Sequence, residues 1–219
     1  MVIPIFNEKI AVYKYDNIDK FKGKEELKKI VDSFYDVPEI KNGDATERYG
    51  NASSSVTMCM EYPVFETFKL DNFEVGAWIR KQISIAAKDL GFDRHKNVDK
   101  YNFIRSWSNR MYKDSHGAAH KHMTGCDMVC IFYYEAPPGS SELVFINDDL
   151  ATKNTDPWYT YPDEKRYHFK PEPGSFVCHF PGIPHAVAQH KCDDTRTVMV
   201  FEPKFTYKPV VTGLNKLKR

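Results

Sequence analysis

The second half of the chain is a series of short apolar segments with no helical pattern between them. Turn residues rich in proline and glycine, such as Pro137–Ser140, separate the segments. The strand-like runs are Tyr101–Ser108, Met128–Tyr134, Glu142–Ile146, Arg166–Phe169, Ser175–Phe180 and Thr195–Phe201. Short strands that follow one another directly are typical of antiparallel sandwiches and jelly-roll barrels. We therefore predict a mainly β fold with flanking helices, whose core is a sandwich or jelly-roll barrel over residues 101–205.

The first 100 residues carry two helical patterns. Apolar side chains spaced i, i+3, i+4 and i+7 predict a helix over Glu25–Phe34. A second helix begins after Asp71 or Asn72, either of which can cap its N-terminus, and ends at Gly91. Its apolar stripe is Val75, Trp78, Ile79, Ile83, Ala86 and Leu90. Because a helix with one apolar stripe must bury it, we expect this helix to lie on the outer face of a sheet.

We predict one domain over residues 1–219. Residues 1–100 would add the strand-like segment Lys9–Tyr15 and the supporting helices to the β core. Two polar segments, Ile40–Ser55 and Asn147–Pro162, are predicted to be long loops at the mouth of a site.

Composition and charge exclude several classes of protein. Lysine and arginine total 31 against 30 for aspartate and glutamate, so the formal charge of +1 creates no strong field for nucleic acids or anionic membranes. No apolar run is long enough to span a bilayer and the N-terminus lacks a signal-peptide pattern, so we expect a cytoplasmic protein. The five cysteines have no disulfide-framework spacing, and Cys130 lies in an apolar run typical of the core.

Three histidines are spaced as ligands of a metal ion. His120 and His122 are two residues apart, so on an extended segment their side chains point to the same face. His185 would approach from a distant strand. Three imidazoles arranged in this way cap one side of an ion such as iron, zinc, copper or nickel and leave the other side open. Asp127 is the alternative third ligand, because it supplies a carboxylate shortly after the histidine pair.

Arg196 is the one charged residue of an apolar strand-like run. Val198 and Val200 share its face of the strand, so the arginine side chain is predicted to face the interior. A buried guanidinium needs an anion, which an organic acid would supply as a carboxylate. A salt bridge to Asp193 or Asp194 is the alternative.

Two polar residues are further candidates for contact with a ligand. Tyr133 lies on the strand predicted to be central, where an inward hydroxyl would need a hydrogen-bond partner. Asn109 follows the first strand of the core and can either bind a ligand or cap a turn.

The order of the motifs resembles that of a known family. Along the chain come Phe103–Asn109, His120 with His122, Tyr133 with Tyr134, Ser141–Phe145, Pro171–Val187 and Arg196. Over roughly residues 102–202 this order is similar to that of the 2-oxoglutarate/Fe(II)-dependent dioxygenases. It looks closest to a branch associated with phages and marine bacteria, in which a His-x-His pair replaces the more common His-x-Asp. The resemblance implies a double-stranded β-helix core, a cupin-like jelly roll, with helices packed outside.

By position, the resemblance implies Fe(II) bound by His120, His122 and His185, with His122 in place of the usual carboxylate. Arg196 matches the arginine that pairs with the distal carboxylate of the co-substrate 2-oxoglutarate, and O2 is the second co-substrate. Two departures follow. A neutral third ligand leaves the site one negative charge short. Val198 stands where relatives often have a serine, so one hydrogen bond to the co-substrate is missing.

The leading hypothesis is a hydroxylase that couples oxidative decarboxylation of 2-oxoglutarate to oxidation of a small molecule or a protein side chain. A three-histidine cupin-type dioxygenase, which binds its substrate directly to iron without 2-oxoglutarate, is one alternative. A non-catalytic jelly-roll binding module or virion-associated module is the other. The sequence carries no pattern that identifies the substrate.

Overall fold

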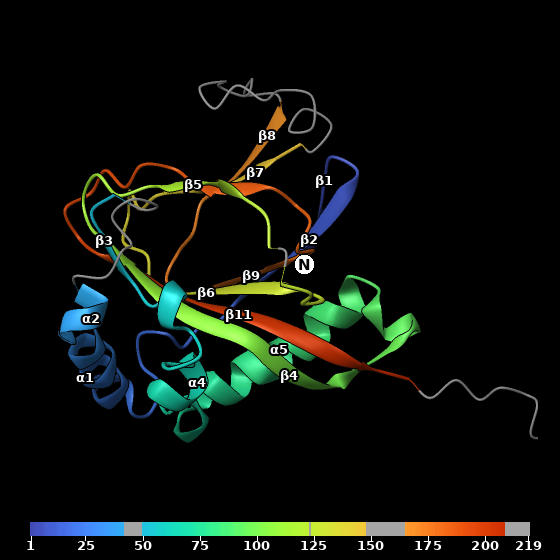
Figure 1. The fold of residues 1–219 in the computed structure, drawn as a ribbon, viewed down its shortest axis with the longest axis horizontal. Helices are drawn as coiled ribbons and strands as arrows, with labels where there is room; N and C mark the ends of the chain where they lie inside the picture. Colours follow the sequence, from blue (N-terminus) through green and yellow to red (C-terminus); the bar gives the residue numbers. More distant parts are fainter. Residues whose placement is uncertain (42–49, 123, 148–164, 209–219) are drawn as a thin grey trace, which may run out of the picture.

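The chain folds into two antiparallel sheets that face each other, with helices beneath the larger one (Figure 1). The computed structural model describes residues 1–41, 50–122, 124–147 and 165–208. The strands are β1 (Val2–Ile5), β2 (Glu8–Lys14), β3 (Ala52–Ser54), β4 (Lys96–Met111), β5 (Gly117–His120), β6 (Val129–Glu135), β7 (Leu143–Ile146), β8 (Arg166–Phe169), β9 (Ser175–His179), β10 (His185–Val187) and β11 (Arg196–Tyr207). The helices are α1 (Lys24–Tyr35), α2 (Pro38–Lys41), α4 (Val64–Thr67) and α5 (Glu74–Asp89), with short 3₁₀ turns η1 (Val56–Met58), η2 (Leu70–Asn72) and η3 (Phe92–Arg94).

The described residues form sheets of seven and four strands. The larger sheet has the order β1-β2-β9-β6-β11-β4-β3, and the smaller has the order β5-β10-β7-β8. This confirms the predicted mainly β jelly roll. The two sheets do not join into a closed barrel over these residues, so the predicted barrel is an open sandwich.

The central strands of the larger sheet are buried on both faces. In β6, Phe132 and Tyr134 pack with the helices, whereas Ile131 and Tyr133 face the smaller sheet. The same alternation continues along β11, because side chains of successive strand residues point to opposite faces. It creates an outer core between the larger sheet and the helices, and an inner core between the two sheets. The prediction of a central strand at Met128–Tyr134 is confirmed.

The helices cover the larger sheet as predicted, with one error at a helix start. Helix α1 matches the predicted Glu25–Phe34, and α5 places its apolar stripe in the outer core. Neither Asp71 nor Asn72 caps α5, because both lie in the 3₁₀ turn η2 and Phe73 occupies the N-cap position. Asp71 instead accepts hydrogen bonds from Arg80, at 2.7 and 2.9 Å.

The prediction of a long loop over Ile40–Ser55 is wrong at both ends, since Ile40 and Lys41 belong to α2 and residues 52–54 form a strand. Within Ile40–Ser55, residues 52–54 form the edge strand β3 beside β4, because their backbone pairs with residues 109–111. Residues 42–49, and residues 148–164 of the second predicted loop, lie outside the described part of the chain. Cys130 is fully buried in β6, which confirms that it is a core residue.

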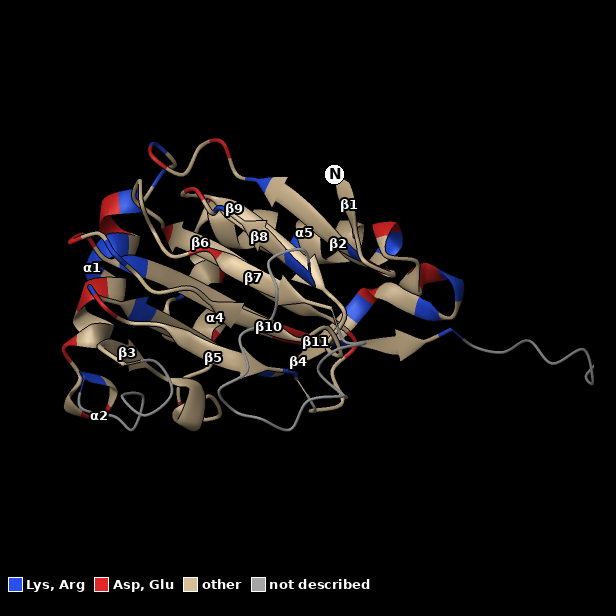
Figure 2. Cartoon of the chain, turned by 90° about the horizontal axis from the view of Figure 1, so that it is seen from above, with Lys and Arg blue, Asp and Glu red and all other residues tan. Residues whose placement is uncertain are grey.

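The charged residues are spread over the edges of the fold. Blue and red segments alternate on the helices and loops, while the strands are mostly uncharged (Figure 2). Among the described residues, no helix is both long and apolar enough to cross a membrane.

Candidate metal centre

The smaller sheet brings the three predicted histidines together. His120 ends β5 and His185 begins β10, and these two residues are direct partners in the antiparallel pairing. His122 follows two residues after His120 and is held by a backbone hydrogen bond from its N–H to the carbonyl of Pro181, at 3.0 Å. One potential ligand atom of each histidine lies within 4.8 Å of the others. Two segments distant in sequence therefore converge as the spacing predicts.

The hydrogen bonds of the three rings select which nitrogen can bind a metal. Nδ1 of His120 donates to the carbonyl of Ala118 at 2.8 Å, and Nδ1 of His185 donates to the carbonyl of Ile183 at 3.1 Å. Nδ1 of His122 lies 2.5 Å from Oε1 of Glu202. In a neutral imidazole with Nδ1 as the donor, Nε2 carries the lone pair. All three rings can therefore offer Nε2 as a ligand.

Two of these nitrogens face each other directly. Nε2 of His122 and Nε2 of His185 are 3.3 Å apart. Two nitrogens at about 2.1 Å from one ion, and at roughly right angles to each other, would be about 3 Å apart. Burial lowers the pKa of His185 well below its ordinary value, and neutral imidazole is the form that binds metals. The donor set and its spacing therefore fit a metal ion.

Glu202 on β11 is the buried partner of His122. Its Oε1 accepts from His122 and from Arg105 at 3.1 Å, and its Oε2 accepts from Arg105 at 3.0 Å and from Thr124 at 2.8 Å. Burial alone would raise the pKa of Glu202, but the hydrogen bonds from His122, Arg105 and Thr124 outweigh burial and lower that pKa to about 2. The carboxylate is therefore ionised and can only accept hydrogen bonds, so Nδ1 of His122 is the donor.

Arg196 is buried beside the histidines with part of its guanidinium unpaired. Its side chain lies over the ring of Tyr133, 4.9 Å from the centroid, and Nη1 contacts the sulfur of Met111 at 3.0 Å. Nε of Arg196 and the hydroxyl of Tyr133 are buried without a hydrogen-bond partner. Burial lowers the pKa of the guanidinium, while Tyr133 opposes that shift. An inward guanidinium and hydroxyl with unmet hydrogen bonds fit the carboxylate of an organic acid.

The alternative partners predicted for Arg196 lie elsewhere. Asp193 pairs with Lys113 at 2.8 Å, and the backbone carbonyl of Asp194 accepts from His190 at 2.7 Å. No salt bridge joins Arg196 to a carboxylate in the part of the chain that the structure describes. The predicted inward orientation of Arg196 holds, and the salt bridge does not form.

The remaining candidates separate into two groups. Asn109 lines the same inner pocket as Arg196, and its side-chain oxygen accepts a hydrogen bond from Ser54. Asp127, the alternative third ligand, points away from the histidines. It binds Lys96 at 2.6 Å and the backbone N–H of Phe205 at 2.9 Å, so the structure does not place it in the histidine group.

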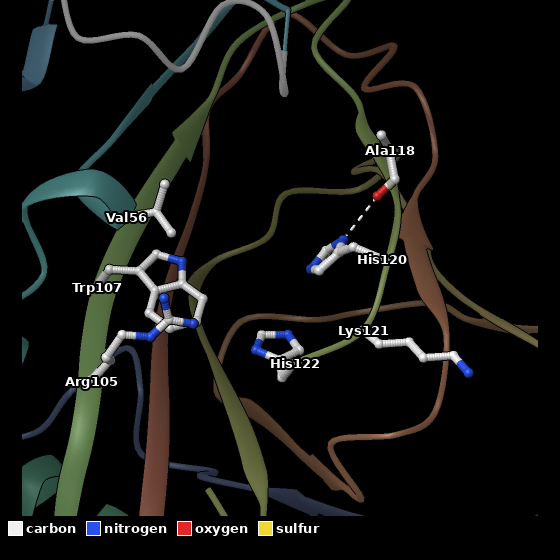
Figure 3. Close-up of a pocket in the computed structure, with 7 residues that line it drawn as sticks. All are labelled: Val56, Arg105, Trp107, Ala118, His120, Lys121 and His122. Atoms are coloured by element: carbon white, nitrogen blue, oxygen red, sulfur yellow. Dashed lines mark hydrogen bonds between the residues drawn. The ribbon is translucent and has the colours of Figure 1, made fainter. Parts of the chain in front are cut away.

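Two pockets meet at the histidines. The inner pocket reaches from His185 to Arg196 between the sheets. The outer pocket, of about 330 Å³, opens beside His120 and His122 and is bordered by Trp107, Arg105 and Val56 (Figure 3). In the same view the side chain of Lys121 points away from the histidines. The open side of the three rings is therefore accessible from outside.

Sequence reasoning missed two residues of this site. Trp107 was not among the candidate site residues, but its ring stacks on His122 with centroids 5.7 Å apart and its Nε1 is buried without a hydrogen-bond partner among the described residues. Glu202 was not singled out, although a carboxylate directly after the apolar run Val198–Phe201 was an available signal, since a buried charge needs a partner.

Residues 105–202 match the model of a family described as "putative 2OG-Fe(II) oxygenase", where 2OG is 2-oxoglutarate. This segment holds both histidine segments, Arg196 and Glu202. Over this part of its length the chain is similar to the 2OG-Fe(II) oxygenases. No curated protein matches the sequence at a significant level.

Several solved structures match this chain. SnoK, a non-haem α-ketoglutarate-dependent carbocyclase from nogalamycin biosynthesis, has a TM-score of 0.55 at 15% identity, with 96% of this chain and 87% of SnoK covered. The epimerase SnoN, solved with Fe³⁺, α-ketoglutarate and nogalamycin RO, has a TM-score of 0.54 at 10% identity, with 94% and 84% covered. A 2OG-Fe(II) oxygenase family oxidoreductase from Burkholderia pseudomallei is matched over 48% of this chain and 44% of its own length, at 18% identity and a TM-score of 0.37. At these identities the matches to SnoK and SnoN support the fold alone.

Proposed function

We propose that the protein is a hydroxylase that uses Fe(II), 2-oxoglutarate and O2. In this reaction 2-oxoglutarate, O2 and a substrate C–H bond give succinate, CO2 and a C–OH group. Iron bound with 2-oxoglutarate supplies the oxidising chemistry, and the protein supplies binding, orientation and the exclusion of water. The observation that carries the proposal is the buried, incompletely paired guanidinium of Arg196 in the pocket that also contains the histidines.

Each residue has a separate task in this proposal. Nε2 atoms of His120, His122 and His185 hold the metal on one side. Arg196 and the hydroxyl of Tyr133 bind the distal carboxylate of 2-oxoglutarate, which satisfies the buried Nε and hydroxyl. Asn109 lies along the wall between these groups and contributes a polar contact to the co-substrate. The rest of that wall is apolar and keeps the pocket dry; it includes Ile131, Leu143, Val198 and Val200.

The substrate enters through the outer pocket. That pocket adjoins His120 and His122 and has a volume of about 330 Å³, which suits part of a small molecule or a single protein side chain. The face of Trp107 and the side chain of Val56 form its apolar border. The near-zero formal charge of +1 gives no support for a nucleic-acid substrate.

The deciding experiment is an anaerobic titration of the apo-protein with Fe(II) and then with 2-oxoglutarate. We expect the visible charge-transfer band of an iron-chelated keto acid. In Arg196→Met, iron binding persists while the 2-oxoglutarate concentration needed for half of the band rises at least about tenfold, a loss of about 1.4 kcal/mol. Arg80→Met is the matched control, because Arg80 pairs with Asp71 on the helical side.

Three outcomes contradict the proposal in different ways. Iron binding without the band, together with turnover that is independent of 2-oxoglutarate, favours a three-histidine dioxygenase that binds substrate directly. A fully coordinated zinc ion with no open position favours a structural metal. Unchanged iron binding in His185→Ala places the metal elsewhere in the molecule.

A further inference from the structure

The three histidines differ in what their Nδ1 atoms contact. His120 and His185 each donate to a neutral backbone carbonyl two residues away. His122 instead contacts a carboxylate, Glu202, which lies 80 residues further along the chain. Among the described residues, Glu202 therefore brings a carboxylate to within one hydrogen bond of the three-histidine group.

Glu202 is held more firmly than a packing role needs. Its side chain is fully buried, and each of its two oxygens accepts two hydrogen bonds. Arg105 forms a bidentate pair with both oxygens, and the hydroxyl of Thr124 donates a hydrogen bond to Oε2. These contacts keep the carboxylate charged and immobile, since a buried ion persists only when it is paired and hydrogen-bonded.

The ring of His122 is clamped in the same way. It stacks on Trp107 on one side, with an angle of 20° between the rings, and on His185, with an angle of 10°. Stacking fixes the plane of the ring but does not decide which nitrogen faces the metal. The contact with Glu202 decides this, because a carboxylate accepts a hydrogen bond from Nδ1–H, and the lone pair of the neutral ring is then on Nε2.

We propose that Glu202 is a positioning residue for metal binding, which orients His122 and makes its imidazole a more strongly donating, partly anionic ligand. Glu202 thus restores through His122 part of the negative charge that a directly bound carboxylate would give. The inference rests on the proposed function, because it takes His122 as a metal ligand. It assigns Arg105 and Thr124 the task of holding the Glu202 carboxylate in place.

The experiment measures Co(II) and Fe(II) binding to apo-protein under anaerobic conditions. We expect Glu202→Gln to weaken metal binding by about 10- to 100-fold, the usual cost of losing an outer partner of a histidine ligand. Glu135→Gln is the matched control, because Glu135 contacts Arg110 and Thr197 on the same sheet and no histidine of the centre. Circular dichroism spectra and melting of the metal-free proteins establish that each variant is folded.

A double-mutant cycle separates the proposed role from a structural one. With His122→Asp as background, Glu202→Gln is expected to leave metal affinity unchanged or to raise it, because no imidazole remains to be oriented and one of two adjacent carboxylates is neutralised. An equal loss of affinity in both backgrounds overturns the proposal. The Fe(II)–2-oxoglutarate band of Glu202→Gln is expected at shorter wavelength, because the iron then has a weaker donor; an unchanged wavelength also counts against the proposal.

Failure of the inference can be told from failure of the proposed function. If Glu202→Gln binds metal like wild type while His185→Ala does not, the metal centre stands and the role of Glu202 is rejected. If His185→Ala binds metal like wild type, the centre itself is misplaced and the cycle has no meaning.

Discussion

The outer core and the inner core of this protein lie on opposite faces of one sheet and are built differently. The outer core joins the sheet to the helices through fully buried apolar residues such as Leu27, Phe132 and Phe201. The inner core is also largely apolar but holds Arg196, Tyr133, Trp107 and His179, each with a buried polar atom that has no hydrogen-bond partner in the described structure. Gln82 and Ser140 are the other residues with such atoms.

This difference shows how the two faces of one sheet can serve different purposes, one for stability and one for binding. Since unpaired buried polar groups cost free energy, a fold that needed only stability would pair or replace them. Here they are concentrated around the histidines and Arg196, where a ligand can satisfy them. The helical side therefore supplies stability, and the side facing the smaller sheet is prepared for binding.

The largest expected effect concerns the inner core alone. His185→Ala removes a ligand from the centre, so we expect Fe(II) affinity to fall beyond the range measurable by anaerobic titration, more than about 100-fold. His168→Ala is the control, because His168 lies on β8 and binds Glu142 at 2.7 Å. Loss of iron binding in the control as well would show that the effect is not specific to the histidines of the centre.

A truncation in the outer core is expected to do the reverse. Phe132 is fully buried and packs near Trp78 and Phe176, with ring centroids 6.2 and 6.4 Å away. Phe132→Ala is expected to lower the free energy of unfolding by about 3–5 kcal/mol, because it leaves a cavity. Urea unfolding measures this loss. Fe(II) affinity of the folded variant is expected to stay within about threefold of wild type. A larger change would show that the packing of the outer core affects metal binding in the inner core.

The ion pair of Asp127 with Lys96 belongs to neither core and contributes to stability through charge. Burial raises the pKa of Asp127, but hydrogen bonds from Lys96, Phe205 and Lys204 outweigh burial and lower it below its ordinary value. A depressed carboxyl pKa contributes stability that is present above about pH 4 and is lost as the pH falls below that value.

We expect Asp127→Asn to cost about 2 kcal/mol at pH 7 and progressively less in acid. Urea unfolding at a series of pH values measures this change. Asp99→Asn is the control, because Asp99 is exposed and its pair with Lys88 is 3.3 Å long. A cost that does not diminish below about pH 4 would show that the charge of Asp127 is not the cause.

The smallest effect on stability is expected at Arg196. Replacing a buried, incompletely paired guanidinium by methionine removes a desolvated charge. The free energy of unfolding of Arg196→Met, measured in urea, is therefore expected to equal that of the wild type or to exceed it by about 1 kcal/mol. A loss of several kcal/mol would mean that Arg196 serves the fold as well as the ligand.

The sequence predicted the jelly roll because alternation in strands and turn residues are local signals. Met128–Tyr134 reads as a central strand from its continuous apolar character, and the structure confirms this. Two errors came from residues whose local preference was overridden. Asp71 is a good N-cap residue but pairs with Arg80, and the small residues 52–54 lie in a polar segment but gain backbone partners on β4.

The site shows the same division between local and long-range information. The spacing of His120 and His122, and the apolar neighbours of Arg196, were sufficient to predict convergence and inward orientation. The contact between His122 and Glu202 was not predictable, because it depends on how the segment after β5 meets the middle of β11. Long-range pairings of this kind have no signature in a single sequence.

The direct pairing of His120 with His185 has a consequence for how the smaller sheet is held together. Strand β10 has only three residues, and it lies between β5 and β7. An ion bound to both histidines would cross-link β5 and β10. A register shift of one residue would turn one of the two ligand side chains to the opposite face of the sheet. Because a ligand that binds only the folded state stabilises it by mass action, the stability of the pairing between β5 and β10 would depend on the concentration of free metal.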